Sequence, residues 1–259
     1  MKKNKLNVAL IQADLIWEDA VKNRAYFDKL LSAVPSETDI VVLPEMFTTG
    51  FSMNPSPLAE TMDGATVRWL KKNAERSDIA ICGSIIIQEN DKFYNRFLFV
   101  QPSGKVTSYD KRHTFNMAGE GKKYAAGKKR VYISYLGWKI FPQICYDLRF
   151  PVFSRNTTDY DLIIYVANWP KTRIAAWDTL LKSRAIENMS YSIGVNRVGT
   201  DGNDLEYIGH SGVYNVLGEE CAFAKAEEKL ITATLSKSHI AETRKKLPFL
   251  EDKDQFQLF

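Results

Sequence analysis

Two short apolar runs constrain the fold of this chain more than any other feature of its sequence. They cover residues 40–43 (Ile-Val-Val-Leu) and residues 162–167 (Leu-Ile-Ile-Tyr-Val-Ala). Each has the length of a β-strand and is apolar at consecutive positions, and both are far shorter than the roughly 20 residues that span a bilayer. Strands of this kind lie in sheets that are covered on both faces. We therefore expect sheets with helices packed on them.

The remaining sequence alternates between helical and strand-like spacing. Helices are expected over residues 19–34, 66–77 and 175–190 and near 239–246. Strands are expected over 6–13, 39–45, 79–111 (three in succession), 129–145 (a pair), 161–169, 191–199, 208–217 and 221–235. This mixture of helices, strands and hairpins predicts the α/β (α+β) class with a mixed sheet. Two sheets between helical layers suit the number of strands, but periodicity alone fits one large sheet equally well.

Composition and cysteine usage are typical of a cytoplasmic globular protein. The 259 residues show no tandem repeat, Ser/Gly linker or break in composition, so we expect one domain over residues 1–259. Cys82, Cys145 and Cys221 are odd in number and far apart, which argues against a disulfide framework and favours a reducing compartment. The net charge of +4 is scattered, so we expect neither nucleic acid nor a membrane as a partner.

Three polar residues come directly after predicted strands, where ligands bind in α/β sheets. Glu45 ends the run Val-Val-Leu-Pro-Glu, Lys111 follows Ser-Tyr-Asp, and Cys145 follows Pro-Gln-Ile. Each has an ordinary explanation by itself: a solvated or capping glutamate, a surface lysine and a small buried cysteine. His113 is likewise more typical of a loop or packed histidine than of a catalytic base.

Considered jointly, these residues form a set suited to acyl transfer. A cysteine nucleophile needs a proton acceptor, which Glu45 can supply for Cys145. A tetrahedral intermediate needs donors aimed at its oxyanion, which the Lys111 ammonium and the backbone N–H of Tyr146 can supply. A helical turn that starts near Asp147 is expected to lower the pKa of the thiol. We expect no metal, nucleotide or other cofactor, and the sequence carries no phosphate-binding loop of the GxxxxGK type.

Three motifs in this order resemble those of the nitrilase, or carbon–nitrogen hydrolase, superfamily. They are Leu-Pro-Glu (43–45), Asp-Lys-Arg-His (110–113) and Ile-Cys-Tyr-Asp-Leu-Arg-Phe-Pro (144–151), and the likeness runs from Leu6 to about Glu220. Within the superfamily the chain looks most like the bacterial omega-amidase branch. Four segments carry this closer likeness: Phe47-Thr-Thr-Gly50, Ala167-Asn-Trp-Pro170, Arg184-Ala-Ile-Glu-Asn188 and Asn196-Arg-Val-Gly-Thr-Asp-Gly-Asn203.

The resemblance implies a four-layer αββα sandwich that dimerises through the helical layer beside the active site. It implies that Glu45 takes the thiol proton and later activates water, that Lys111 stabilises the tetrahedral intermediate, and that Cys145 forms a thioester. A second family glutamate lies between the lysine and the cysteine. Glu120 in Met-Ala-Gly-Glu fits it, although its neighbours differ from the common Pro-Gly-Glu. It would orient Lys111 or the substrate amide, whereas without the resemblance it would be a solvated loop residue.

The substrate implied by the resemblance is a small omega-amide of a dicarboxylic or α-keto acid, such as 2-oxoglutaramate or succinamate. Related enzymes bind a substrate carboxylate with an arginine just after the nucleophile, and Arg149 lies four residues past Cys145. An internal salt bridge to Asp147 or to another acid would also explain this arginine. Lys171 and Arg173 are weaker candidates for the same role.

Aromatic residues near the motifs are expected to wall the pocket. These are Phe47, Phe115 and Trp169, although aromatic residues beside strands often belong to the core instead. Other functions stay open at this point. A nitrilase or an N-carbamoyl amino acid hydrolase would use the same thioester chemistry, and a non-catalytic binding protein on this fold would be expected to lack one of the three motif residues.

Overall fold

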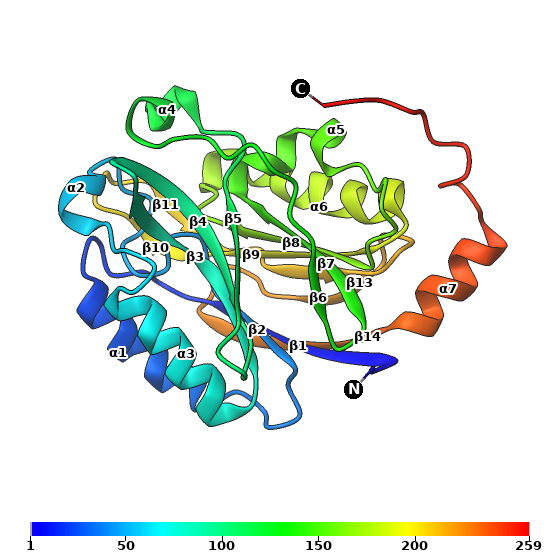
Figure 1. Ribbon diagram of the computed structural model, residues 1–259, viewed down its shortest axis with the longest axis horizontal. Coiled ribbons are helices and arrows are strands. Elements are labelled where there is room, and N and C mark those ends of the chain that lie inside the picture. Colours follow the sequence, from blue (N-terminus) through cyan, green and yellow to red (C-terminus); the bar gives the residue numbers. More distant parts are fainter. Residues whose placement is uncertain (1, 259) are drawn as a thin grey trace.

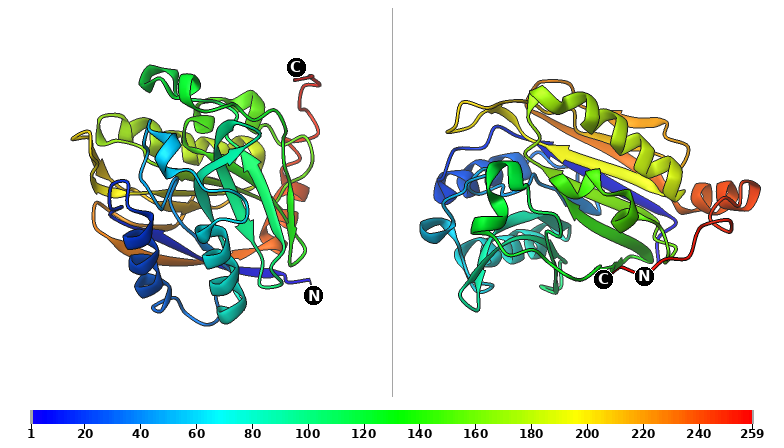
Figure 2. Two further views of the ribbon diagram at one scale, coloured as in Figure 1. Left: turned by 60° about the vertical axis from the view of Figure 1, so that its left-hand side comes forward. Right: turned by 90° about the horizontal axis from the view of Figure 1, so that it is seen from above.

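Two six-stranded sheets lie face to face, and helices cover the outer side of each (Figure 1). The computed structural model describes residues 2–258. The views in Figure 2 show the same layers from two further directions. The predicted αββα order is therefore confirmed, and one large sheet is excluded. No helix within residues 2–258 is both long and apolar enough to cross a membrane.

The first sheet has the strand order β14-β1-β2-β3-β4-β5. Its strands are β1 (Lys5–Gln12), β2 (Ile40–Val42), β3 (Ala80–Glu89), β4 (Lys92–Val100), β5 (Val106–Asp110) and β14 (Lys229–Ser236). Helices α1 (Ala20–Leu31) and α3 (Ala65–Ser77) lie on its outer side (Figure 1). Both helices were predicted from the spacing of their apolar residues, which contact the sheet through Phe27, Val67 and Leu70.

The second sheet has the order β13-β12-β9-β8-β7-β6. Its strands are β6 (Ile133–Tyr135), β7 (Trp138–Ile144), β8 (Leu162–Ala167), β9 (Tyr191–Asn196), β12 (Gly212–Tyr214) and β13 (Glu220–Phe223). Helix α6 (Ile174–Asn188) covers it and buries Trp177 and Leu181. The helix comes so close that a Cβ atom at Gly194 of β9 would lie 2.4 Å from Leu181. A side chain at this position would force the helix away from the sheet.

Shorter elements complete the chain. They are the strand pair β10 (Val198–Thr200) and β11 (Glu206–Ile208), the helices α2 (Pro55–Leu58), α4 (Glu120–Lys123), α5 (Pro151–Ser154) and α7 (Lys237–Lys246), and the 3₁₀-helices η1 (Asn116–Ala118), η2 (Cys145–Arg149) and η3 (Lys171–Arg173). Helix α7 confirms the polar helix predicted near 239–246.

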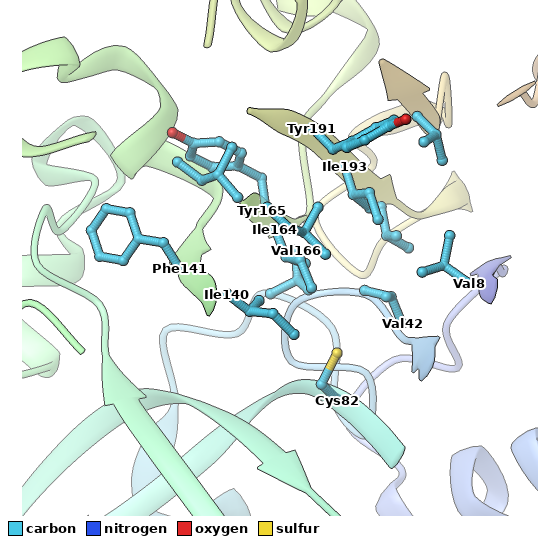
Figure 3. Packing of buried hydrophobic residues seen from close by; sticks show 14 of the residues in the cluster. Val8, Val42, Cys82, Ile140, Phe141, Ile164, Tyr165, Val166, Tyr191 and Ile193 are labelled. Atoms are coloured by element: carbon cyan, nitrogen blue, oxygen red, sulfur yellow. The ribbon is translucent and has the colours of Figure 1, made fainter. Parts of the chain in front are cut away.

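The two apolar runs are strands buried on both faces, as predicted. In β2, Ile40 and Val42 face the second sheet, whereas Val41 faces the helices on the other side. All six residues of β8 are buried. Figure 3 shows Val42 and Cys82 of the first sheet against side chains of the second. Successive residues of a strand point to opposite faces, so consecutive apolar residues fill both the core between the sheets and the core beneath the helices.

The expectation of one strand over 221–235 is wrong. This segment forms β13 in the second sheet and β14 in the first, so the chain crosses between the sheets over residues 224–228. The side-chain amide of Gln12 donates hydrogen bonds to the backbone oxygens of Lys225 and Glu227, at 2.5 and 2.7 Å. A partner from a distant strand thus holds the bend, and the apolar pattern of the segment does not reveal it.

The face-to-face packing of the two sheets brings the ends of their strands together. Glu45 follows β2 of the first sheet, and Asn168 follows β8 of the second. The backbone N–H of Asn168 donates to Oε2 of Glu45 at 2.8 Å, and its side-chain amide donates to the Glu45 carbonyl at 2.6 Å. The carboxyl ends of the parallel strands therefore meet at one place, where a site is expected.

Candidate active site

Cys145 follows directly on β7 and begins η2. Its backbone φ is +45°, in the left-handed region that residues with a side chain rarely adopt. Strained residues of this kind cluster at functional sites, where the surrounding structure holds them in place. The turn ends the strand abruptly and places the cysteine on the wall of a cavity.

Asp147 ties this turn to the segment after β5. Its buried carboxylate accepts hydrogen bonds from the backbone N–H groups of Ile144 at 3.0 Å and His113 at 2.9 Å. It also bonds Nδ1 of His113 at 2.7 Å and accepts from the Tyr109 hydroxyl at 2.8 Å. The His113 ring stacks on Phe150 at 3.8 Å between ring centres. This histidine is therefore a packed residue, which agrees with the non-catalytic interpretation of it from the sequence. The two segments are thus fixed to each other by one satisfied buried carboxylate.

Glu45 is fully buried, so the interpretation as a solvated loop residue is wrong. Its Oε1 accepts hydrogen bonds from Asn95 Nδ2 at 2.7 Å and from Lys111 Nζ at 3.0 Å. Asn95 is itself held by the Ser84 hydroxyl at 2.8 Å. With the backbone N–H of Asn168 on Oε2, three donors stabilise a carboxylate that burial alone would disfavour.

Lys111 lies between two buried carboxylates. Its ammonium is 3.0 Å from Glu45 and 2.9 and 3.0 Å from the two oxygens of Glu120. Both Lys111 and Glu120 are buried, which overturns the surface lysine and the solvated glutamate as interpretations. Glu120 begins α4 and also accepts from the backbone N–H of Phe115. The three side chains form one buried network, which is stable only because each charge is paired.

Burial and charge act differently on these groups. Burial would lower the pKa of Lys111, but Glu120 and Glu45 outweigh it and raise this pKa, so the ammonium stays charged. Burial raises the pKa of Glu120, and Lys111 opposes that shift. Burial also raises the pKa of the Cys145 thiol well above its usual value, with Glu45 adding to the shift and Lys111 opposing it. The resting thiol therefore keeps its proton.

The expectation that a helix start lowers the pKa of the Cys145 thiol is thus wrong. The following helix is one short 3₁₀ turn, and the thiol is partly buried within reach of two negative carboxylates, Glu45 and Glu120. These effects exceed the effect of a few backbone N–H groups. A thiol in such a place becomes nucleophilic only when a neighbouring base takes its proton.

A cavity of about 230 Å³ opens beside Cys145. Its lining includes Phe115 and Trp169, which were predicted to wall the pocket, and also Tyr146. Glu45, Lys111 and Glu120 lie behind the cysteine, outside this lining. The cavity is small and combines aromatic walls with a few polar side chains, which suits a substrate of few atoms held by a small number of polar groups.

Phe47 does not line the cavity, and its prediction as a pocket residue is wrong. It is fully buried in the core beneath the helices, with its ring edge-on to Phe27 at 5.4 Å between ring centres. The aromatic residue of this loop that does line the cavity is Phe51, four residues later, whose ring lies 4.9 Å from the Lys111 ammonium. The sequence offered two neighbouring phenylalanines, and periodicity cannot tell which one faces the core in an irregular loop.

Arg149 lines the cavity, and its guanidinium lies over the Trp169 ring at 5.0 Å. The alternative of a salt bridge between Arg149 and Asp147 is wrong, because Asp147 bonds His113, Tyr109 and Ile144 instead. Arg149 is left beside the cavity with no acid partner among residues 2–258.

Two polar residues of the site were missed in the sequence. Asn95 is the one amide side chain in β4, where the other residues apart from Lys92 and Arg96 are apolar or aromatic, and a buried amide in a strand is a recognisable signal. Asn168 stands in the Ala-Asn-Trp-Pro segment, which had been noted only as a family likeness. Its backbone oxygen lies 3.9 Å from the Cys145 sulfur.

The arrangement combines a thiol, a carboxylate beside it and a fixed ammonium. These are the groups that a nucleophilic acyl transfer needs: a nucleophile, a proton acceptor and a positive charge for the developing oxyanion. Within residues 2–258, no group of three or more His, Cys, Asp or Glu side chains is placed to hold a metal ion.

Comparison with known proteins agrees with this chemistry. A family model described as carbon–nitrogen hydrolase matches residues 7–245. The chain is 46% identical to the omega-amidase YafV of Escherichia coli over 255 residues, covering 98% of this chain and 99% of that protein. It is 30% identical to the 2-oxoglutaramate amidase of Bacillus subtilis, covering 96% and 97% of the two chains.

A solved structure is also similar over the whole length. It belongs to a protein of Xanthomonas campestris, described as a CN-hydrolase superfamily member with an arsenic adduct in its active site. The TM-score is 0.97 at 43% identity, and the match covers 99% of this chain and 100% of that one.

Proposed function

The chain belongs to the carbon–nitrogen hydrolase family, and on that premise we propose that it hydrolyses a small omega-amide of a dicarboxylic or α-keto acid to the acid and ammonia. The observation that carries this proposal is the buried network of Glu45, Lys111 and Glu120 directly behind Cys145. The choice of an omega-amide is supported by the similar proteins, which are an omega-amidase and a 2-oxoglutaramate amidase.

The first half of the reaction forms a thioester. Glu45 takes the proton of the Cys145 thiol as the sulfur attacks the amide carbon, which becomes tetrahedral. The Lys111 ammonium and the backbone N–H of Tyr146 stabilise the negative oxygen. Glu45 then returns its proton to the amide nitrogen, the C–N bond breaks, and ammonia is released. The acyl group stays on the sulfur of Cys145 as a thioester.

The second half hydrolyses the thioester. Glu45 takes a proton from water, and the resulting hydroxide attacks the acyl carbon. The C–S bond breaks, the acid is released, and the proton goes back to the sulfur of Cys145. Glu120 acts on both halves by fixing Lys111, since its two oxygens lie 3.0 and 2.9 Å from the ammonium.

The amide's far end is a carboxylate, for which Arg149 is the proposed partner. A guanidinium can bind a carboxylate through two parallel hydrogen bonds. Arg149 lies beside the cavity over Trp169, and no acid of the described chain neutralises it. Trp169 and Phe115 would wall the carbon chain of the substrate.

Ammonia release from a panel of compounds tests this function. The panel holds succinamate, 2-oxoglutaramate, glutamine, asparagine, an aliphatic nitrile and an N-carbamoyl amino acid. Turnover confined to the first two is the expected result. Preference for the nitrile or the carbamoyl compound would move the protein to another branch of the family with the same cysteine chemistry. No turnover of any compound would favour a non-catalytic binding protein.

We further propose that the protein is a single domain, a homodimer and cytoplasmic. The pairing of β1 with β14 supports one domain, because it joins the first and last strands of the chain. Val152 on α5 and Ile186 on α6 are 55% and 51% exposed, which supports a dimer formed through this helical layer. Three free cysteines support a reducing compartment. Size-exclusion chromatography with light scattering tests the dimer, which a monomer at micromolar concentration would contradict.

A further inference from the structure

A second arginine lines the same cavity as Arg149. Arg173 is the last residue of η3, and its guanidinium lies over the Phe115 ring at 5.0 Å. Like Arg149, it makes no ion pair with any acid among residues 2–258. Both guanidinium groups lack an acid partner and lie beside one small cavity. For the half-buried Arg173 this is unusual, because charges withdrawn from water are ordinarily paired.

The rings beneath these arginines are themselves held by the site. The Trp169 indole N–H donates to the Arg173 carbonyl at 2.8 Å, so the platform of Arg149 is fixed to the backbone of Arg173. The Phe115 backbone N–H donates to the Glu120 carboxylate, and the Phe115 ring lies edge-on to Tyr146 at 5.0 Å. Both guanidinium groups thus rest on residues that the site already fixes, which reduces the entropy lost when they bind an anion.

Other charged groups of the same region already have partners. Lys171, at the other end of η3, pairs with Glu206 at 2.9 Å, and both side chains are more than half exposed. Asp201 is an acid that lines the cavity, and its carboxylate accepts hydrogen bonds from the Tyr207 hydroxyl at 2.8 Å and from the backbone of Asn203 at 2.8 Å, while neither arginine forms an ion pair with it. The positive charges of the cavity that lack an ion-pair partner are therefore those of the two arginines.

We propose that Arg173 is a second anion-binding residue of the substrate site and the one that chiefly selects amides with a carboxylate at the far end. The proposal rests on the amidase function proposed above. Arg149 is exposed, whereas Arg173 is half-buried, so water and salt screen the attraction of Arg173 for a carboxylate less. A 2-oxo acid offers adjacent carboxylate and keto oxygens to the two guanidinium groups, which makes omega-amides of α-keto acids the substrate class that uses both.

The test compares two amides of matched length, succinamate and butyramide, which differ by a carboxylate in place of a methyl group. Arg173→Gln is expected to lower kcat/KM for succinamate by about 10- to 100-fold, mainly through KM, because a charge-assisted hydrogen bond is lost. Butyramide should lose far less. Arg149→Gln should lose less selectivity than Arg173→Gln. Lys171→Gln removes a positive charge two residues away but outside the cavity, and is expected to leave the ratio of the two substrates unchanged.

Two results would overturn the proposal: an unchanged succinamate-to-butyramide ratio in Arg173→Gln, whether or not both activities fall, or a loss of the same size in Lys171→Gln. A binding measurement separates this failure from failure of the amidase function. Calorimetry with succinate on the Cys145→Ala protein needs no turnover, and Arg173→Gln in that background should weaken succinate binding by the same factor. If no amide is hydrolysed but Arg173→Gln still weakens succinate binding, the result supports the anion-binding role of Arg173 and contradicts the proposed amidase function.

Discussion

Asp147 and His113 bind each other across the two segments that carry the reactive groups, with 2.7 Å between Oδ1 and Nδ1. Asp147 lies two residues after Cys145, and His113 lies two residues after Lys111. The pair therefore sets the distance between the nucleophile and the ammonium without touching either. This positioning role accounts for a buried acid and a partly buried histidine beside the site, neither of which lines the cavity.

Asp147→Asn should weaken this link. The amide cannot replace all four hydrogen bonds of the carboxylate, so we expect a loss of about 1–3 kcal/mol in the free energy of unfolding. kcat should fall more than KM rises, because the nucleophile and the ammonium shift relative to each other. Denaturant midpoints and steady-state kinetics measure the two effects.

A matched control for Asp147→Asn exists on α6. Asp178 bonds Nδ1 of His210 at 3.0 Å in a partly exposed pair away from the cavity. Asp178→Asn should leave kcat intact and cost less stability, since exposed pairs contribute little. Equal effects of the two substitutions on kcat would show that Asp147 has no special positioning role.

Cys145→Ala should abolish ammonia release while leaving the fold intact. The side chain loses only one sulfur atom, and Cys145 is the one thiol among residues 2–258 that lines the cavity. A loss of at least about a thousandfold in kcat is expected for removal of a covalent nucleophile. Circular dichroism checks the fold. Cys221→Ser, at an exposed position, serves as the control and should keep full activity. Turnover by Cys145→Ala would refute the nucleophile.

Lys111→Met should leave two buried carboxylates, Glu45 and Glu120, without their cation. We expect a loss of about 3–5 kcal/mol in stability near neutral pH, as for other broken buried pairs. With the opposing charge of Lys111 gone, burial should raise the pKa of Glu120 further, so the folded variant should hold a proton on Glu120 that the unfolded chain releases near the ordinary pKa of 4.5. Its stability should therefore rise as the pH falls toward that value.

The double variant Lys111→Met/Glu120→Gln removes one of the two stranded charges. It should recover part of the stability and show a shallower dependence of unfolding free energy on pH. Melting temperatures of the wild type and both variants across pH 5 to 8 measure this. If the melting temperature of Lys111→Met depends on pH as that of the wild type does, the proposed charge coupling among Lys111, Glu45 and Glu120 is contradicted.

The pH dependence of activity should follow the raised pKa values of the network. Glu120 is needed as a carboxylate to hold Lys111, and burial raises its pKa, so kcat/KM should fall on the acid side at a pH above 4.5. The pKa of Lys111 is raised above 10.5, so its charge should be kept throughout neutral and mildly alkaline pH. A kcat/KM that stays constant down to pH 4.5, with the protein still folded, would contradict the requirement for an ionised Glu120 with a raised pKa.

The sequence was a good guide to the layers and to the reactive residues for one physical reason. Residues 40–43 and 162–167 are apolar at every position, and only strands buried on both faces use such runs. Glu45 and Cys145 stand where strands end, and costly polar groups at such places mark sites. These patterns are local in the sequence, and the corresponding strands and strand ends are present in the structure.

What could not be predicted depends on contacts between distant segments. The bend between β13 and β14 is held by Gln12, more than two hundred residues earlier in the chain. The pKa of Cys145 depends on burial and on two carboxylates that other segments supply, so a rule about helix starts gave the wrong sign. The choice between Phe47 and Phe51 as the pocket residue depends on the path of an irregular loop.

The full pairing of β1 with β14, from Lys5 with Ser236 to Gln12 with Lys229, has a consequence for synthesis on the ribosome. β1 leaves the ribosome first but lies between β2 and β14, so one of its edges stays open until residues 229–236 have been made. An unpaired edge on an apolar strand invites pairing with other chains. A nascent chain stalled before β14 should therefore need a chaperone, and a stop codon at residue 229 should give insoluble protein even though every residue of the active site is present.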